Sequence, residues 1–256
     1  MRLFFDVGNT RIKWVLEEAG SFTSSGVINH ESDGFDSLGS LLGCLKIESV
    51  WASSVASPVV NQKLEAWVER SLNLITNWAS VKQTQLGIEN CYEDLSKLGV
   101  DRWMALIGAD DYRKSQGLQD APIIIVDAGT AVTIELLDEG CQYRGGAILP
   151  GVVLMHDSLV GRTQGVASNF MSIDAVIGQS TQECVNAGVR YGVVGAVERV
   201  VNQICELPDV DQAKVLLLIT GGDADFINQN STLNFIVLPQ LVLSGLLGVA
   251  NDGGKR

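Results

Sequence analysis

The chain has 256 residues, which is enough for two domains of ordinary size or one large domain. Hydrophobic residues make up 46% of it, so it can bury a substantial core, and its formal net charge is −12. Nucleic-acid backbones are bound by clustered lysine and arginine, whereas this sequence is acidic and has no run of five basic residues. We therefore expect no nucleic-acid partner.

The cysteines, the histidines and the apolar tracts indicate which other classes of protein are excluded. The five cysteines form no C-x-x-C pair, which is typical of reduced thiols in a cytoplasmic protein. His30 and His156 are too isolated for a zinc site. The longest apolar tract, residues 235–249, contains polar residues and is shorter than the roughly 20 residues that a membrane-spanning helix needs. We expect a soluble, cytoplasmic protein without a membrane partner.

The first predicted element is a strand over residues 3–6, which leads through a turn into a second strand over residues 12–16. The turn is Asp6-Val7-Gly8-Asn9-Thr10, with a carboxylate, a glycine and a hydroxyl where the first strand emerges. Alternating apolar residues in the second run are typical of a half-buried strand. Further along, Ser57-Pro58 predicts a helix start, because serine caps helices and proline suits their first position.

A polar segment follows and contains Tyr92. It leads into Leu98-Gly99-Val100-Asp101-Arg102-Trp103, after which apolar residues recur at helical spacing. This periodicity places Asp101 at or near a helix N-cap, where unpaired N–H groups and the helix dipole stabilise a carboxylate. From its position alone, Asp101 is either a cap or a chemical group.

A second turn of the same design occurs in the middle of the chain. Residues 116–122 are a predicted linker, which separates the halves 1–118 and 119–256. The next run, residues 123–126, is apolar throughout and suits a strand buried on both faces. It ends in Asp127-Ala128-Gly129-Thr130-Ala131 and a second alternating run. Recurrence at nearly half the chain length predicts two related α/β halves.

Two later strands also end in glycine-bearing loops. Residues 215–219 lead into Thr220-Gly221-Gly222-Asp223, and a strand that begins at Arg144 ends in Pro150-Gly151. Ligands of open α/β sheets bind at the carboxyl ends of strands. These loops are therefore candidates for a ligand site.

Two helices are predicted near the end of the chain. The first runs from about residue 181 to 205, with Gly188, Gly192 and Gly195 near one face. Each interior glycine costs roughly 1 kcal/mol relative to alanine. We therefore expect another element or subunit to approach this face closely. The second helix, residues 239–249, is apolar on more than one side and must be buried.

The two Asp-x-Gly turns have a chemical interpretation. Backbone N–H groups of a glycine turn can face a polyphosphate, and a neighbouring hydroxyl or amide can contact its oxygens. An aspartate there would repel phosphate unless a cation lies between them, which favours Mg²⁺ with a nucleotide. A single turn could be a plain β-turn, but two in register favour phosphate binding. The sequence has neither a P-loop nor a G-x-G-x-x-G motif.

The duplicated arrangement resembles the acetate and sugar kinase, Hsp70 and actin superfamily. Within it, the chain is similar to type III pantothenate kinases in residues 6–10, Lys13, Tyr92, 98–103, 127–131, 145–148, 150–151, 180–181 and 220–223. The chain departs from the family at Leu95, where the family's Y-x-x-P segment has proline. This residue lies in the expected substrate loop and is not a reacting group.

The resemblance implies an α/β fold of two duplicated ribonuclease H-like (actin-like ATPase) domains. Each would have a mixed sheet flanked by helices, with the active-site cleft between the domains. It implies ATP-dependent phosphorylation of the primary hydroxyl of pantothenate, the first step toward coenzyme A. Mg²⁺ and a monovalent cation, K⁺ or ammonium, would be required, and the protein would be a homodimer.

The resemblance also implies roles for individual residues. Asp101 would be the catalytic carboxylate, Asp127 would bind the monovalent cation, and Asp6 would hold Mg²⁺ through the phosphates. The expected ATP-binding residues are Asp6, Val7, Gly8, Asn9, Thr10, Arg11, Ile12, Lys13, Thr130, Thr220, Gly221, Gly222 and Asp223. The expected pantothenate-binding residues are Tyr92, Gly99, Val100, Asp101, Arg102 and Thr181. Arg102 has a guanidinium group whose fork geometry suits the carboxylate of the substrate.

Two other interpretations stay open. Another small-molecule kinase or an exopolyphosphatase of the superfamily would keep the phosphate turns but would not need the Gly99–Trp103 segment beside Tyr92. A non-catalytic regulator on the same fold could lose Asp6 or Asp101 without penalty, whereas both are present.

Overall fold

The structure is a computed structural model that describes residues 1–29, 35, 38–39, 42, 45–162 and 176–253. The chain divides into two compact units, Met1–Tyr112 with Gln240–Arg256, and Arg113–Pro239. These units differ from the predicted halves, because the carboxy-terminal segment packs with the first unit and the second unit begins at Arg113. No helix among the described residues is both long and apolar enough to cross a membrane.

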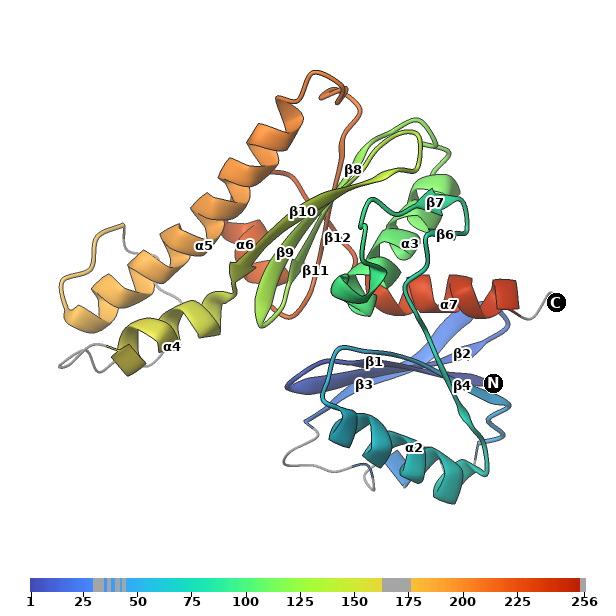
Figure 1. The fold of residues 1–256 in the computed structure, drawn as a ribbon. Helices are drawn as coiled ribbons and strands as arrows, with labels where there is room; N and C mark the ends of the chain where they lie inside the picture. Colours follow the sequence, from blue (N-terminus) through green and yellow to red (C-terminus); the bar gives the residue numbers. More distant parts are fainter. Residues whose placement is uncertain (30–34, 36–37, 40–41, 43–44, 163–175, 254–256) are drawn as a thin grey trace. The chain divides into compact units, whose positions relative to one another are not determined.

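The first unit is built on a mixed five-stranded sheet (Figure 1). Its strands lie in the order β3-β2-β1-β4-β5. β1 is antiparallel to β2 and parallel to β4, β2 is antiparallel to β3, and β4 is parallel to β5. The strand bounds are β1 Arg2–Val7, β2 Arg11–Glu18, β3 Ser21–Asn29, β4 Ser49–Ser54 and β5 Thr76–Trp78.

Helix α2 (Pro58–Leu72) packs its apolar face on this sheet. As predicted, Ser57 is the N-cap, with extended φ and ψ of −64° and 153°, and proline occupies the first helical position. The ring of Trp67 is 2% exposed and meets Phe5 edge-on, with the ring centroids 6.3 Å apart. The helix therefore supplies one wall of the core of this unit.

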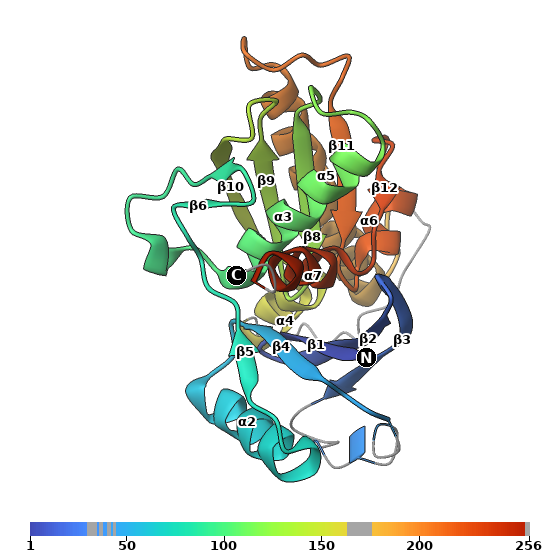
Figure 2. The same cartoon turned by 90° about the vertical axis from the view of Figure 1, so that its right-hand side faces the viewer.

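Among its described residues, the first unit also contains a hairpin, a short 3-10 helix and the two longer helices α3 and α7. Helix α7 packs against β1 and β4, and it crosses α3 at two glycines (Figure 2). A methyl group added at Gly108 would overlap the carbonyl oxygen of Leu241, and one at Gly245 would overlap that of Met104. Burial of α7 was predicted and is confirmed. The bounds are β6 Thr84–Gln85, β7 Ile88–Glu89, η1 Leu95–Lys97, α3 Val100–Ser115 and α7 Leu241–Gly253.

The second unit repeats the sheet of the first. Its strands lie in the order β10-β9-β8-β11-β12, in which β8 is antiparallel to β9 and parallel to β11. β9 is antiparallel to β10, and β11 is parallel to β12. The bounds are β8 Ile123–Ala128, β9 Ala131–Leu137, β10 Tyr143–Pro150, β11 Leu216–Thr220 and β12 Ile236–Val237.

Strand order and strand directions are therefore the same in both units, which confirms the predicted duplication of a mixed sheet flanked by helices. In the second unit, α5 buries valines such as Val193 and Val197 against one face of the sheet. Strand β8 is buried on both faces as predicted, with Ile123, Ile124 and Ile125 all 0% exposed. The helix bounds are α4 Val152–Arg162, α5 Thr181–Cys205 and α6 Ala224–Asn230.

Candidate functional site

The pairing of β1 with β4 brings a carboxylate and a buried hydroxyl together at the end of β1. Asp6 is half-buried, and its register partners are Lys13 on β2 and Ser53 on the parallel strand β4. The Ser53 hydroxyl is 0% exposed and donates to Asp6 Oδ1 at 3.4 Å. Ser53 was not among the predicted residues, because only the strand register shows that it lies beside Asp6.

The turn itself is closed by its backbone, since the Gly8 N–H donates to the Arg11 carbonyl at 3.0 Å. Asn9, Thr10 and Arg11 are exposed. Val7 and Ile12 are 0% exposed, so their side chains pack in the core of this unit.

The turn that follows β8 repeats this arrangement in the second unit. Asp127 is half-buried and pairs in register with Thr133 on β9 and Thr220 on the parallel strand β11. Thr220 thus takes the place beside Asp127 that Ser53 takes beside Asp6. The turn is one residue shorter than the first, because residues 129–131 lie between Ala128 and its partner Val132 while residues 8–11 lie between Val7 and Ile12.

The loop after β11 lies against the end of β8. The Asp223 N–H donates to the Ala128 carbonyl at 2.9 Å. Gly221 has a φ of 99°, and a methyl group there would overlap the backbone of Ala128. The structure therefore brings Asp127, Thr130 and the loop 220–223 to one edge of the sheet, where the parallel strands β8 and β11 end.

Thr181 does not lie with these residues. It is the first residue of α5 and is exposed, at the end of the helix that lies beside α4 and away from β8 and β11 (Figure 1). Ser180 caps this helix, since its hydroxyl accepts from the Glu183 N–H at 3.2 Å. Within the second unit, Thr181 therefore lies apart from the turn that follows β8.

The predicted pantothenate-binding residues of the first unit cluster at the start of α3. Arg102 is 8% exposed, and its Nη1 donates to the Tyr92 hydroxyl at 3.1 Å. The Arg102 guanidinium carbon also lies 5.7 Å from the centroid of the Tyr92 ring. Tyr92, Asp101 and Gly99 are all half-buried. An aromatic ring, a carboxylate and a guanidinium group thus meet at one helix end.

Asp101 lies one residue inside the helix, because α3 begins at Val100. Its Oδ1 accepts from the Arg102 N–H at 2.7 Å, so the carboxylate is turned back toward the helix start. A methyl group added at Gly99 would lie only 2.5 Å from the same oxygen, so a larger residue there would require the Asp101 carboxylate to shift. The predicted stabilisation of Asp101 by orphan helix N–H groups agrees with this contact.

No three of His, Cys, Asp and Glu gather in a metal-sized cluster within the part of the chain that the structure describes. Mg²⁺ usually keeps several waters and takes only one or two protein carboxylates together with substrate phosphates. A single aspartate at the end of β1, held by the Ser53 hydroxyl, fits a metal that arrives with a nucleotide. No disulfide joins the cysteines that are described.

The repeated mixed sheets, each ending in an aspartate-glycine turn, define an actin-like ATPase fold of the kind found in sugar kinases. Sequence comparison gives the family: the family model for type III pantothenate kinase matches residues 2–203, and the chain belongs to that family. The type III pantothenate kinase of Nitrosococcus oceani is 30% identical over 100% of this chain and 96% of its own length. That of Alcanivorax borkumensis is 34% identical over 98% of both chains.

Solved structures agree on the fold. A Campylobacter jejuni protein assigned to the Baf family of transcriptional activators has a TM-score of 0.59 at 19% identity, covering 99% of this chain and 100% of its own. A Sinorhizobium meliloti protein assigned as a 2-dehydro-3-deoxygalactonokinase has a TM-score of 0.61 at 11% identity, covering 98% and 99%. At these identities the similarity concerns the fold alone.

Proposed function

We propose that this chain phosphorylates pantothenate with ATP to give 4'-phosphopantothenate and ADP, the first step of coenzyme A biosynthesis. The match of the type III pantothenate kinase family model over residues 2–203 carries this proposal. The cluster of Tyr92, Asp101 and Arg102 supports it, because a small hydroxy acid needs both a carboxylate partner and a base near its hydroxyl.

ATP would be held by the two turns. The exposed residues of the first turn, Asn9, Thr10 and Arg11, and the half-buried Lys13 would contact phosphate oxygens. Asp6 would hold Mg²⁺ through the phosphates, where the cation neutralises negative charge on the transferring group. Thr130 would contact ATP in the second unit, and residues 220–223 would border the adenosine.

Pantothenate would be bound by Tyr92, Gly99, Val100, Asp101, Arg102 and Thr181. Arg102 is already oriented by its bond to the Tyr92 hydroxyl, and the fork geometry of a guanidinium group suits the substrate carboxylate. The Asp101 carboxylate would take the proton of the primary hydroxyl as the oxygen bonds to phosphorus and the bond to ADP breaks. Positioning and charge neutralisation dominate such a reaction, so the base acts late.

Asp127 would bind a monovalent cation, K⁺ or ammonium. The duplication supports this assignment, because the second turn would present a carboxylate to a polyphosphate as the first one would, and a cation between them would remove the repulsion.

A cytoplasmic location is favoured by the cysteines, because their sequence contains no C-x-x-C pair and is typical of reduced thiols.

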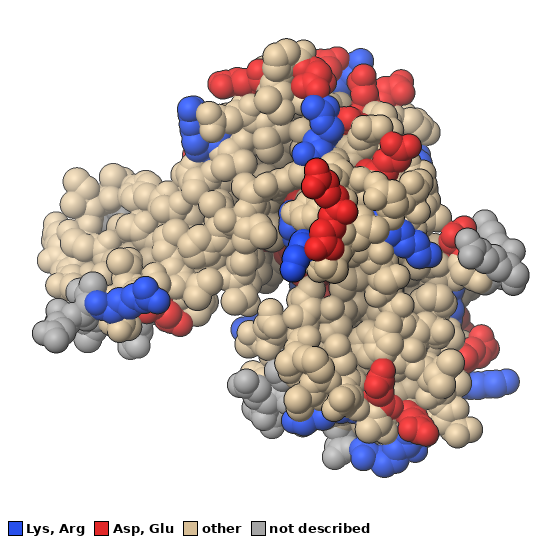
Figure 3. Space-filling model, in the orientation of Figure 1, with Lys and Arg blue, Asp and Glu red and all other residues tan. Residues whose placement is uncertain are grey.

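A homodimer would use the exposed face of the second unit around α4 and α5. Gly188 and Gly195 have no neighbouring atom within 4 Å of an added methyl group, although Met155 of α4 approaches Gly192. Figure 3 shows that the surface over these helices is mostly uncharged in this view. Exposed apolar residues there are Ile148, Val153, Leu154, Leu159 and Tyr191. An isologous contact between two such faces would cover them and would give the exposed Thr181 a second chain to meet.

The test is a turnover assay with ATP, Mg²⁺, K⁺ and pantothenate, in which ADP and 4'-phosphopantothenate should form in equal amounts. Sugars and polyphosphate should not replace pantothenate. A purified, folded chain that hydrolyses or transfers nothing under these conditions would instead point to a non-catalytic regulator, and activity on another alcohol would point to a different kinase.

A further inference from the structure

The segment before α3 contains a buried amide that the proposed reaction does not use. Asn90 follows the β6–β7 hairpin, whose turn residues Leu86 and Gly87 have positive φ of 52° and 90°. Asn90 is 5% exposed. A polar side chain that is nearly fully buried is retained where its hydrogen bonds hold a particular backbone conformation.

Asn90 is fixed to the opposite side of the hairpin. Its backbone N–H donates to the Gln83 carbonyl at 2.9 Å, and its carbonyl accepts from Gln83 Nε2 at 2.7 Å. Its side-chain Nδ2 donates to the Lys82 carbonyl at 3.4 Å. These contacts leave Oδ1 in a defined place.

That oxygen holds Tyr92. The Tyr92 N–H donates to Asn90 Oδ1 at 3.0 Å, the two-residue spacing of an Asx-turn. At its other end, the Tyr92 side chain is held by Arg102, which donates to the hydroxyl at 3.1 Å. Tyr92 is thus fixed at both its backbone and its phenol oxygen.

The hairpin is itself fixed to α3. Trp103 Nε1 donates to Gln85 Oε1 at 2.7 Å, and these two side chains are 0% and 7% exposed. Connected contacts therefore run from Trp103 through the hairpin to Asn90 and Tyr92, and return to α3 at Arg102. This series of contacts therefore begins and ends on α3, at the adjacent residues Trp103 and Arg102, and Arg102 directly follows Asp101.

We propose that Asn90 is a positioning residue for Tyr92, and that it thereby sets the affinity for pantothenate. This inference rests on the proposed function. Asn90 touches neither substrate nor reacting atoms, and it acts by fixing where the aromatic ring lies relative to Arg102 and Asp101. The start of the loop is set by the Asx-turn at Asn90. The next turn is set by Asp94, which accepts from the Ser96 N–H at 3.0 Å.

The main test is a kinetic comparison of Asn90→Ala with Asn90→Asp. Alanine removes the acceptor for the Tyr92 N–H, and we expect the KM for pantothenate to rise about tenfold, the factor for one lost hydrogen bond. The KM for ATP should stay unchanged, and kcat should stay within about twofold, as expected when ground-state binding is lost. Asn90→Asp keeps an acceptor for the Tyr92 N–H but loses the Nδ2 donor to the Lys82 carbonyl, so it should restore part of the affinity, and Asn90→Ser, with a shorter acceptor, should restore less.

Asn77→Ala is the matched control. Asn77 lies on β5, is half-buried, and donates from Nδ2 to the Val50 carbonyl at 2.9 Å, away from the Tyr92 segment. It should lower Tm without changing the KM for pantothenate. A wild-type KM in folded Asn90→Ala, with only Tm reduced, would assign a structural role and overturn the proposal.

Hydrogen exchange of the Tyr92 amide separates this proposal from the proposed function. The amide should exchange faster in Asn90→Ala than in the wild-type chain. If Asn90→Ala does not fold, Asn90→Ser takes its place in this comparison. Unchanged exchange would overturn the positioning role, whatever the substrate is. Absence of pantothenate turnover by the wild-type chain would overturn the proposed function alone, and the exchange result would still decide the role of Asn90.

Discussion

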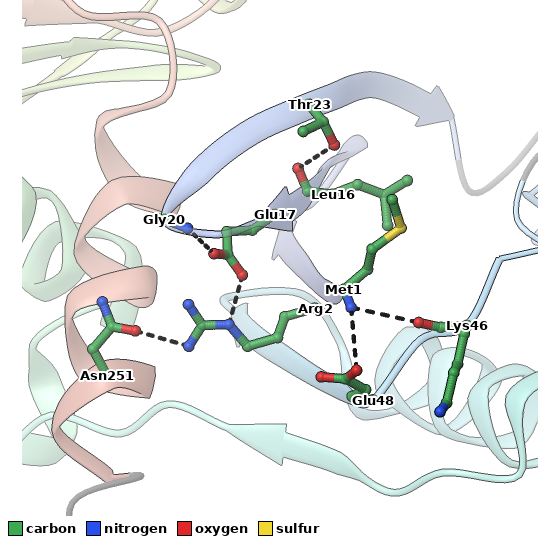
Figure 4. Close-up of polar contacts among 9 residues, drawn as sticks. All are labelled: Met1, Arg2, Leu16, Glu17, Gly20, Thr23, Lys46, Glu48 and Asn251. Carbon is green, nitrogen blue, oxygen red and sulfur yellow. Dashed lines mark hydrogen bonds and ion pairs between the residues drawn. The ribbon is translucent and has the colours of Figure 1, made fainter.

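Arg2 and Glu17 face each other across the β1–β2 pair, with Arg2 Nε 2.6 Å from Glu17 Oε2 (Figure 4). The Glu17 carboxylate also accepts from the Gly20 N–H at 2.5 Å, and Arg2 Nη1 donates to Asn251 Oδ1 on α7 at 2.8 Å. Glu17 is 3% exposed, so its charge is compensated almost entirely by these contacts. The pair therefore joins the first two strands of the chain to its last helix.

Replacing Arg2 with methionine should destabilise the first unit. The change leaves a buried carboxylate without its guanidinium partner, and we expect the free energy of unfolding to fall by about 2 kcal/mol. Urea denaturation monitored by fluorescence measures this. The control is Arg144→Met, which breaks an exposed ion pair to Asp209 with an N–O distance of 2.7 Å and should have a much smaller effect. Equal effects of the two changes on the free energy of unfolding would contradict the stabilising role of the buried Arg2–Glu17 pair.

The same pair predicts a pH dependence. The hydrogen bond from Arg2 lowers the pKa of Glu17 below its ordinary value of 4.5, and this outweighs the effect of burial, which raises it. A carboxyl whose pKa is lower in the folded chain stabilises the fold above the pKa of the unfolded chain. The stability difference between wild type and Glu17→Gln should therefore be complete above about pH 4.5 and shrink as the pH falls below it. A difference that grows toward low pH would exclude this mechanism.

Asp101→Asn distinguishes a cap from a catalytic base. Asparagine keeps an acceptor for the Arg102 N–H, so Tm should change little. If Asp101 accepts the alcohol proton, kcat and kcat/KM should both fall by roughly 10²–10⁴. Steady-state kinetics beside a thermal melt measure both quantities. Asp111→Asn, an exposed change further along α3, is the control and should retain activity. Near wild-type kcat in folded Asp101→Asn would refute the catalytic role.

Asp127→Ala tests the monovalent cation site. Loss of the carboxylate should weaken the activation by K⁺ more than the activation by Mg²⁺, because Asp6 in the other turn is unchanged. Titrations of activity with each ion, at saturating concentration of the other, compare the two responses. Asp211→Ala, which alters an exposed carboxylate 3.2 Å from Lys214, should leave both curves in place. Full turnover of Asp127→Ala in buffer that contains only sodium would rule out the assignment.

Tyr191→Glu tests the homodimer. Tyr191 is 50% exposed on α5, and a charge placed there should be costly to bury in a contact between two copies. Light scattering coupled to gel filtration should show a dimer for the wild-type chain and a monomer for the variant. Ile75→Glu alters a residue of the first unit that is 79% exposed, and it should remain dimeric. A monomeric wild-type chain with full activity would contradict the proposal.

Residues close together in the sequence determined much of the fold. The apolar run 123–126 and the dipeptide Ser57-Pro58 predicted β8 and the start of α2, because strand burial and helix capping depend on neighbouring residues. The recurrence of the Asp-x-Gly turn predicted the duplication that both sheets confirm. The family could also be predicted from motifs alone, and the family model confirms it.

Only the tertiary structure decided which distant residues meet. Ser53 lies beside Asp6 because β4 pairs in one particular register with β1, and Gln85 bonds to Trp103 because the hairpin packs on α3. The sequence predicted that the last helix is buried, whereas its contacts place it in the first unit. Strand register and helix packing depend on side-chain fit between segments far apart in the chain, and a local pattern carries no information about that fit.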